Sequence, residues 1–318
     1  MAISKIKPTI GVNDKLFIID INPGNDEITK DLVIGRFAKM IKNISQYQKV
    51  VILSHSTLSL LKKMVKDIGL KKGYVVSDNG ARIYNIDEDK VIYDNSMDRD
   101  EVLAIVHFAI MQNALVLVSG SQREYGYSLN LLNSSSLNKK HYLPLPYTSD
   151  YPKFVKFIDS TIIHSILIFQ KEREKMLKTL DKFSAIAKDW TFNAVQGQHS
   201  YFVVTDRENT KYNAILKIME ILKISNVEQI YYYALNTINN QCLKAFKHHL
   251  IHQDIALISG YYSKISIQAN IDNMITNIRH VFFDAAETAN DTYVTKEIID
   301  TKRLSQIMTE ARNTKKIS

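Results

Sequence analysis

Short apolar runs alternate with helical patterns over the first quarter of the chain. Residues 16–19 form an apolar run typical of a buried strand, and residues 50–53 and 74–77 give two more. Between these runs, apolar residues recur at helical spacing over 33–44 and 58–68. Strands that alternate with helices at this pace are typical of a parallel sheet covered by helices on both faces. The sequence therefore predicts an α/β fold built on a doubly wound parallel sheet.

The middle of the chain follows a different pattern. We expect a helix over residues 102–111, a strand over 162–169, and a hairpin with arms at 192–195 and 201–205. Residues 120–152 form a polar, aromatic stretch that is too long and too irregular for a simple connection. These patterns predict an α+β module inserted into the α/β fold.

The alternation of strands and helices resumes near residue 205. The expected elements are helices near 215–222, 242–249 and 302–312, and strands near 229–233, 255–258 and 281–283. We therefore predict a core domain made of residues 1–84 and 200–318, and an inserted α+β cap domain made of residues 85–199.

Composition narrows the classes of protein to which the chain can belong. Its 318 residues, 45% of them hydrophobic, are enough for one large domain or two smaller ones. Cys242 is the only cysteine, which excludes a disulfide within the chain and a thiolate metal cluster. No apolar run approaches the roughly 20 residues of a membrane span. The first residues lack the apolar core of a signal peptide, so we expect no membrane association and a cytoplasmic location.

The formal charge of +8 raises the question of an acidic partner. The lysines are scattered along the sequence, and the densest basic groups, at 139–141 and 315–316, are short. This pattern favours a solvated surface and argues against a nucleic-acid partner.

Asp20 ends the first apolar run and is followed by Ile-Asn-Pro-Gly at 21–24. A strand that delivers a carboxylate into such a turn places it at the carboxyl edge of the sheet, where α/β proteins bind ligands. A carboxylate in that position is suited to nucleophilic attack on phosphorus. The alternative is a strand-end carboxylate that only caps a turn.

Further motifs follow Asp20 in a fixed order. An apolar strand ends in Ser54, an Asn-Gly-Ala sequence occupies 79–81, and Lys211 opens a predicted helix after the inserted module. Together with residues 20–22, this order and the position of the insertion resemble the haloacid dehalogenase (HAD) superfamily. The resemblance is to the Cof-type phosphatases, which carry a large α+β cap of subclass IIB.

The resemblance implies a role for each matching residue. Asp20 is the nucleophile that forms an aspartyl phosphate, Ser54 donates a hydrogen bond to a phosphate oxygen, and Lys211 neutralises phosphate charge. Asn79 and Gly80 contact the substrate. The resemblance also implies Mg²⁺ as cofactor, held by the side chain of Asp20 and the backbone of residue 22.

Three positions that carry catalytic or metal-binding acids in the family depart from its pattern. Asn22 stands where the family has a second aspartate, which protonates the leaving group and then activates water, and an amide cannot exchange a proton at neutral pH. Leu235 and Asn239 stand where the family's fourth motif has acids, although Mg²⁺ prefers carboxylate oxygens. Asp78, beside Asn79, could replace a metal ligand, but we favour the interpretation that it is a turn carboxylate.

Two other features carry weaker functional interpretations. His248 and His252 are four residues apart and would share one face of a helix, a spacing that can chelate a metal. No third ligand is evident in the sequence, so we favour an exposed helix face. The tyrosines at 231–233 lie on a predicted core strand, so we interpret them as packing residues.

Two functional hypotheses follow. In the first, the chain is a degenerate phosphatase-like protein that has lost most Mg²⁺-dependent hydrolysis and binds a small phosphorylated ligand or a protein partner. In the second, it is an active hydrolase of a small phosphorylated metabolite, such as a sugar phosphate, with a rearranged metal site. The sequence identifies neither the ligand nor the partner.

Overall fold

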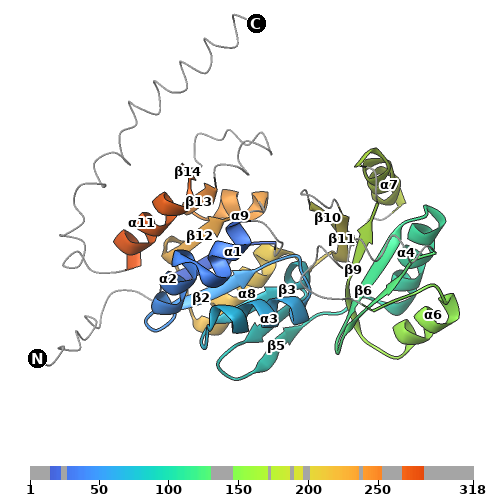
Figure 1. Cartoon of the computed structure of the whole chain (residues 1–318), viewed down its shortest axis with the longest axis horizontal. Coiled ribbons are helices and arrows are strands. Elements are labelled where there is room, and N and C mark those ends of the chain that lie inside the picture. Colours follow the sequence, from blue (N-terminus) through green and yellow to red (C-terminus); the bar gives the residue numbers. More distant parts are fainter. Residues whose placement is uncertain are drawn as a thin grey trace, which may run out of the picture. The chain divides into compact units, whose positions relative to one another are not determined.

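A computed structural model of the chain describes most of the residues between Lys15 and Phe282 (Figure 1). The described ranges are 15–22, 27–129, 146–170, 173–186, 190–195, 201–235, 239–252 and 267–282. The chain divides into two compact units, Met1–Gln268 and Ala269–Ser318. None of the described helices is long and apolar enough to cross a bilayer.

An eight-stranded sheet organises the first unit, in the order β14-β13-β12-β1-β2-β3-β4-β5. Strand β1 pairs in parallel with β12 and β2, and β3 extends the parallel arrangement, whereas β4 and β5 are antiparallel. The strands are β1 (Leu16–Asp20), β2 (Lys49–Leu53), β3 (Tyr74–Ser77), β4 (Arg82–Asn85), β5 (Lys90–Asp94), β12 (Ile230–Ala234), β13 (His248–His252) and β14 (Ile267–Ala269).

Helices cover both faces of this sheet, as the alternation in the sequence predicts (Figure 1). On one face, Leu16 and Ile18 pack with α8 (Lys211–Leu222) and α9 (Asn240–Ala245). The other helices beside the parallel strands are α1 (Glu27–Ile34), α2 (Arg36–Ile44) and α3 (Leu58–Ile68), and Figure 1 shows α2 and α3 in front of the sheet. Because β1 is buried along its whole length, every side chain from Leu16 to Asp20 lies inside the protein. The α/β fold class with an inserted α+β part is confirmed.

The inserted segment forms a six-stranded sheet with the strand order β10-β11-β9-β6-β7-β8. Four antiparallel pairings and one parallel pairing join its strands. Helices α4 (Arg99–Met111), α6 (Tyr151–Asp159) and α7 (Arg173–Ile186) accompany β6 (Leu115–Gly120), β7 (Glu124–Tyr127), β8 (Tyr147–Thr148), β9 (Ile163–Phe169), β10 (Trp190–Val195) and β11 (Tyr201–Asp206).

Two strands next to the predicted limits of the insertion, residues 85 and 199, pair across those limits. Strand β5 follows residue 85 but pairs with β4 in the eight-stranded sheet. Strand β11 follows residue 199 but pairs with β9 and β10 in the six-stranded sheet. As a division into domains, 1–84 with 200–318 against 85–199 stays a prediction.

Several sequence expectations are corrected by the structure. The predicted helix over 242–249 is wrong in its second half: α9 ends at Ala245 and β13 begins at His248, so His248 and His252 lie on a strand and do not share a helix face. The predicted strand over 281–283 is also wrong, because Val281 and Phe282 end helix α11 (Ile271–Phe282). The strand expected at 255–258 and the helix expected at 302–312 lie outside the described residues.

Candidate functional site

Four of the residues singled out from the sequence lie near one another at the carboxyl edge of the eight-stranded sheet. Asp20 ends β1, and Ser54 follows β2 and is held by a backbone hydrogen bond of 3.0 Å to Val76. Asn79 follows β3, and its backbone N–H donates to the carbonyl of Ser54 at 3.2 Å. Lys211 opens α8, and its ammonium contacts the carboxylate of Asp20.

Both oxygens of Asp20 have partners from the protein itself. Nζ of Lys211 donates a hydrogen bond to Oδ1, and the hydroxyl of Tyr232 on β12 donates to Oδ2. All three side chains are fully buried. The carboxylate that would act as nucleophile therefore lies in a closed, internally satisfied cluster, which we call the Asp20 triad.

Burial controls the electrostatics of the Asp20 triad. Loss of water raises the pKa of Asp20 above its usual range, although the charge of Lys211 and the hydrogen bonds from Lys211 and Tyr232 oppose that rise. Burial lowers the pKa of Lys211, against the attraction of Asp20. The pKa of Tyr232 is raised well above its usual value, first by burial and then by the nearby Asp20, so its hydroxyl stays protonated and remains a donor.

A close backbone approach positions Lys211 beside the sheet. Gly80 has a φ of +113°, and a Cβ atom added there would lie 2.3 Å from the carbonyl oxygen of Thr210. Thr210 caps α8 by accepting a hydrogen bond from the backbone of Asn213, so Lys211 occupies the first helical position. Glycine at residue 80 thus permits the contact that brings the start of α8 to Asp20.

Asn79 joins the turn after β3 to the start of the same helix. Its Nδ2 donates to the carbonyl of Asn209 at 3.0 Å and to the hydroxyl of Thr205 at 3.5 Å. Its Oδ1 is buried and has no hydrogen-bond partner among the described residues. A ligand that donates a hydrogen bond could satisfy this oxygen.

Asn22 is fixed by two hydroxyl donors. Its Oδ1 accepts hydrogen bonds from Ser56 at 3.0 Å and from Tyr201 on β11 at 2.8 Å. Ser54, two residues before Ser56, accepts a hydrogen bond from the backbone of Ser56 at 3.0 Å. The amide of Asn22 therefore links the turn after β2 to the six-stranded sheet.

The described residues at this edge do not fit a Mg²⁺ ion. Leu235 offers no side-chain oxygen, and Oδ1 of Asn239 caps α9 by accepting from the backbone of Cys242 at 2.9 Å. No group of three or more acidic, histidine or cysteine side chains suited to a metal occurs in the described part of the chain. Since Mg²⁺ requires near-octahedral oxygen ligation, Asp20 and a carbonyl at residue 22 make an incomplete donor set.

Asp78 is held in a separate buried network. Its carboxylate accepts hydrogen bonds from Arg82 at 2.7 and 2.9 Å, from Ser77 at 2.8 Å and from Ser165 at 2.8 Å. Burial alone would raise the pKa of Asp78, but the charge of Arg82 leads a set of interactions that hold it below its usual value. A carboxylate with these partners has little capacity left for a metal.

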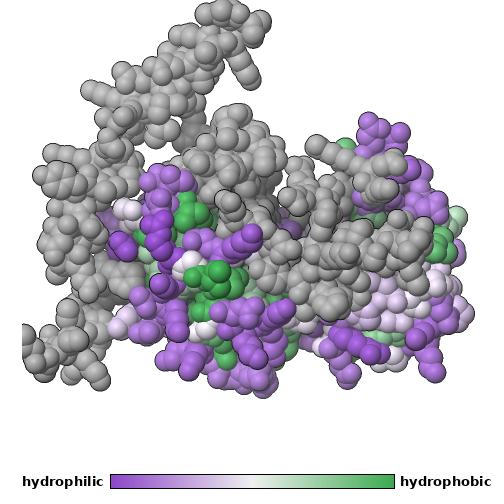
Figure 2. Space-filling view, in the orientation of Figure 1, coloured by the Kyte–Doolittle hydropathy of each residue, from purple (hydrophilic) through white to green (hydrophobic). Residues whose placement is uncertain are grey.

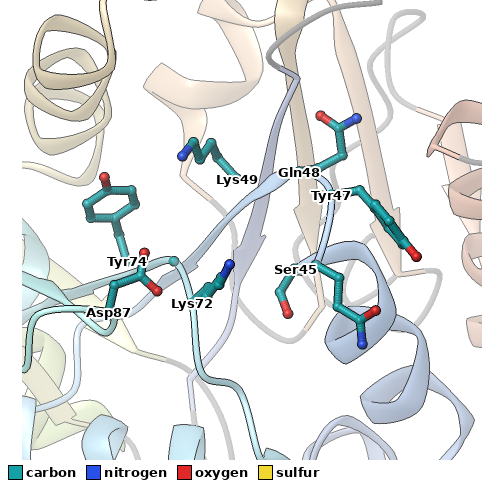
Figure 3. Close-up of a pocket in the computed structure, with 9 residues that line it drawn as sticks. Ser45, Tyr47, Gln48, Lys49, Lys72, Tyr74 and Asp87 are labelled. Carbon is teal, nitrogen blue, oxygen red and sulfur yellow. The ribbon is translucent and has the colours of Figure 1, made fainter. Parts of the chain in front are cut away.

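A small hollow lies at the opposite edge of the eight-stranded sheet (Figure 3). Its volume is ≈ 110 Å³, and its lining includes Lys49 and Tyr74, which begin β2 and β3, together with Lys72 and Asp87. Because strands β1 to β3 are parallel and Asp20 ends β1, this hollow is separate from the Asp20 triad.

The described part of the surface that Figure 2 shows gives no argument for a particular protein partner. Figure 2 shows hydrophilic residues over most of the described surface in this view, with smaller hydrophobic patches between them. Strongly exposed apolar side chains such as Ile34 (77%) and Met111 (66%) lie on different elements, α1 and α4.

Sequence reasoning missed two tyrosines. Tyr232 is a packing residue, as expected, but its hydroxyl also contacts Asp20. Strand β12 pairs in parallel with β1 so that Tyr232 lies beside Ile18, two residues before Asp20. An extended phenol can reach the next side chain on the same face of the neighbouring strand, which is Asp20. Tyr201 had no such signal, since its contact with Asn22 joins residues 179 positions apart.

A family model identifies the family of the chain, and solved structures share its fold. The family model of haloacid dehalogenase-like hydrolases matches residues 31–231. A haloacid dehalogenase-like hydrolase from B. subtilis is 16% identical, with a TM-score of 0.68 over 84% of this chain and 99% of that one. No curated protein matches the sequence.

Two further solved structures share the fold. A sugar phosphatase of HAD subclass IIB is 14% identical, with a TM-score of 0.64 over 84% of this chain and 98% of that one. A HAD phosphatase from Bacteroides thetaiotaomicron is 13% identical, with a TM-score of 0.66 over 87% of this chain and 98% of that one.

Proposed function

Because the chain belongs to the haloacid dehalogenase-like hydrolase family, we propose that it is a phosphatase-like protein with little or no Mg²⁺-dependent hydrolysis. Its remaining role is to bind a small phosphorylated ligand or a protein partner. The observation that supports this proposal most strongly is the Asp20 triad. In it, Lys211 and Tyr232 each donate a hydrogen bond to one oxygen of the candidate nucleophile.

Attack on phosphorus requires a lone pair of Asp20 to face the phosphate. Each carboxylate oxygen has two lone pairs, and the hydrogen bonds from Lys211 and Tyr232 engage one on each oxygen. If either donor has to turn away to admit a phosphate, a buried polar group loses its hydrogen bond, at a cost of about 1–3 kcal/mol. The cluster therefore stabilises the resting state of Asp20 against reaction.

Two further chemical losses support weak catalysis. Asn22 cannot transfer a proton, and loss of a positioned acid or base typically lowers a rate by a factor on the order of 10²–10⁴. The incomplete donor set leaves a phosphate dianion facing Asp20 without a metal to offset repulsion. A unit-charge pair at ~4 Å repels by about 4 kcal/mol at an effective dielectric of 20.

The alternative, an active hydrolase with a rearranged metal site, needs a replacement carboxylate. Asp78 was the candidate, and its oxygens accept hydrogen bonds from Arg82, Ser77 and Ser165. This network weighs against the alternative. A binding role has support from Oδ1 of Asn79, a buried acceptor at the same edge that a ligand donor could satisfy.

A phosphatase assay tests the proposal directly. The wild-type chain is incubated with an aryl phosphate and with sugar phosphates in excess Mg²⁺, with Asp20→Asn as the matched control. We expect wild type and control to be indistinguishable. Turnover near the median enzyme kcat of about 10 s⁻¹, abolished by Asp20→Asn, would overturn the proposal. Calorimetric titration with MgCl₂ gives an independent readout, and we expect no saturable binding.

A further inference from the structure

Two segments of the chain connect the eight-stranded sheet to the six-stranded sheet, and hydrogen bonds join these two segments to each other. Asn95 follows β5, where the chain leaves the eight-stranded sheet, and Asn209 precedes α8, where it returns. Nδ2 of Asn95 donates to Oδ1 of Asn209 at 2.7 Å, and Nδ2 of Asn209 donates to the carbonyl of Asn95 at 3.2 Å. We call this pair of segments the crossing.

Buried polar contacts reinforce the crossing. Arg82 on β4 donates to Ser119 on β6 at 2.9 Å, and Ser165 on β9 donates to Asp78 at 2.8 Å. All four side chains are at most 3% exposed. These bonds join Ser119 on β6 and Ser165 on β9 to the turn after β3 and the start of β4, so they restrain the six-stranded sheet near its connection to the eight-stranded sheet.

Tyr201 makes its contact far from the crossing. It begins β11, whereas Thr205, four residues later on the same strand, already receives a hydrogen bond from Asn79 beside the crossing. At about 3.3 Å per residue, Tyr201 lies roughly 13 Å farther along the strand. There its hydroxyl donates to Oδ1 of Asn22 at 2.8 Å.

This distance makes the contact sensitive to rotation of the six-stranded sheet. A rotation of about 10° about the crossing displaces a point ~13 Å away by roughly 2 Å, enough to break a hydrogen bond. A contact at Thr205 would survive the same rotation. The bond between Tyr201 and Asn22 is therefore well placed to hold the sheet in one orientation.

The environment of Tyr201 favours a lasting bond. Its side chain is 5% exposed, and its ring packs on Phe169 with centroids 5.0 Å apart. Burial raises the pKa of Tyr201 to about 12, so the hydroxyl remains a donor over the physiological pH range. Asn22 is fixed from the other side by Ser56.

We propose that Tyr201 and Asn22 form a latch that holds the six-stranded sheet closed over the Asp20 triad, and that ligand entry requires this latch to open. Asn22, two residues after Asp20, thus takes part in closure where the family has a proton-transfer group. The latch concerns the site of the proposed function, but it makes no use of hydrolysis.

The test measures the separation of the two sheets by electron-electron resonance between spin labels. Lys66→Cys on α3 and Lys156→Cys on α6 place both labels on exposed positions, and the native Cys242 is buried. In this background we expect one narrow distance distribution. Tyr201→Phe removes only the hydroxyl and should broaden the distribution, with a second population enriched roughly three- to tenfold, as the loss of one hydrogen bond predicts.

Two further variants make the result decisive. Asn22→Ala removes the acceptor and leaves Tyr201 in place, so it should broaden the distribution in the same way. Tyr127→Phe removes a hydroxyl from another buried tyrosine of the six-stranded sheet and should leave the distribution narrow. An unchanged distribution in folded Tyr201→Phe and Asn22→Ala, or equal broadening in Tyr127→Phe, overturns the latch. No ligand or turnover enters the measurement, so the latch and the proposed function can fail separately.

Discussion

The hydroxyl of Tyr232 donates a hydrogen bond to Oδ2 of Asp20, while Lys211 occupies the other carboxylate oxygen. Two strands that are neighbours in the sheet, β1 and β12, supply this contact. The residue that the family resemblance presents as a nucleophile is therefore also the centre of a buried polar cluster. Its substitution should affect folding as well as chemistry.

Tyr232→Phe should lower the free energy of unfolding by about 1–3 kcal/mol, because Oδ2 of Asp20 stays buried after its donor is removed. Urea denaturation gives the value. Tyr74→Phe is the control: Tyr74 begins β3 and is 8% exposed, and no hydrogen bond of its hydroxyl occurs among the described residues. Equal losses in the two variants would contradict a specific role for the contact with Asp20.

Arg82→Met should destabilise the protein by about 3–5 kcal/mol, since it leaves the buried carboxylate of Asp78 without its cation. The measurement is again urea denaturation. Lys217→Met breaks an exposed pair with Glu220 and should change stability little. The prediction fails if the two substitutions have similar effects.

His164 should make stability depend on pH below neutrality. Burial, followed by the charge of Arg82, lowers its pKa from the usual value of 6.5, against attraction from Asp78 and Asp94. The unfolded chain then takes up a proton at a higher pH than the folded chain does. Stability should therefore fall as the pH drops from above 6.5 toward the lowered value.

The free energy of unfolding measured at several pH values tests this dependence. His164→Gln should flatten the slope, whereas His107→Gln, on an exposed position of α4, should leave it unchanged. A wild-type stability that rises on acidification through this range would show that the sign is wrong.

Asn22→Asp alone should restore no measurable hydrolysis of an aryl phosphate. The new carboxylate can exchange a proton, but Leu235 still offers no side-chain oxygen and Tyr232 still donates its hydrogen bond to Asp20. The same assay on Asn22→Asp with Leu235→Asp and Asn239→Asp provides the comparison. Activity in the single variant that is dependent on Asp20 would show that the missing proton shuttle was the only barrier.

Gly80→Ala should destabilise the protein by at least about 2 kcal/mol, because it adds a Cβ atom against the Thr210 carbonyl at a positive φ. Gly69 also has a positive φ, of +74°, but the nearest atom to a Cβ there is the end of the Lys42 side chain at 3.4 Å. Gly69→Ala should therefore cost only about 1 kcal/mol. Comparable losses by chemical denaturation would mean that the approach to Thr210 is not the cause.

Strands that carry the site were predictable because each is a short run that is apolar, apart from Ser77 at the end of the third. The runs at 16–19, 50–53 and 74–77 all form parallel strands. The positions of Asp20 and Ser54 at the carboxyl edge of the sheet could be predicted from where the first two strands end. Lys211 was predictable as the start of a helix, but its contact with Asp20 rests on the family resemblance and on packing at Gly80.

Other features depend on contacts that no local pattern encodes. One helical stripe over 33–44 became two helices, because Gly35 separates α1 from α2. Histidines at 248 and 252 fit a helical spacing, yet pairing with β12 makes their segment a strand. Strand pairing overrode the local helical preference there. The hydroxyl contacts of Tyr201 and Tyr232 join residues that are far apart in the sequence, so no local pattern predicts them.

The mutual hydrogen bonds of Asn95 and Asn209 mean that the chain enters and leaves the insertion at adjacent points. A segment with neighbouring ends can be gained, lost or exchanged without cutting a strand of the parent sheet. Asn95 and Asn209 are 114 positions apart, and replacing the residues between them by a short turn would keep the order of the eight-stranded sheet. The same adjacency offers a natural position for grafting a foreign insertion in evolution or in the laboratory.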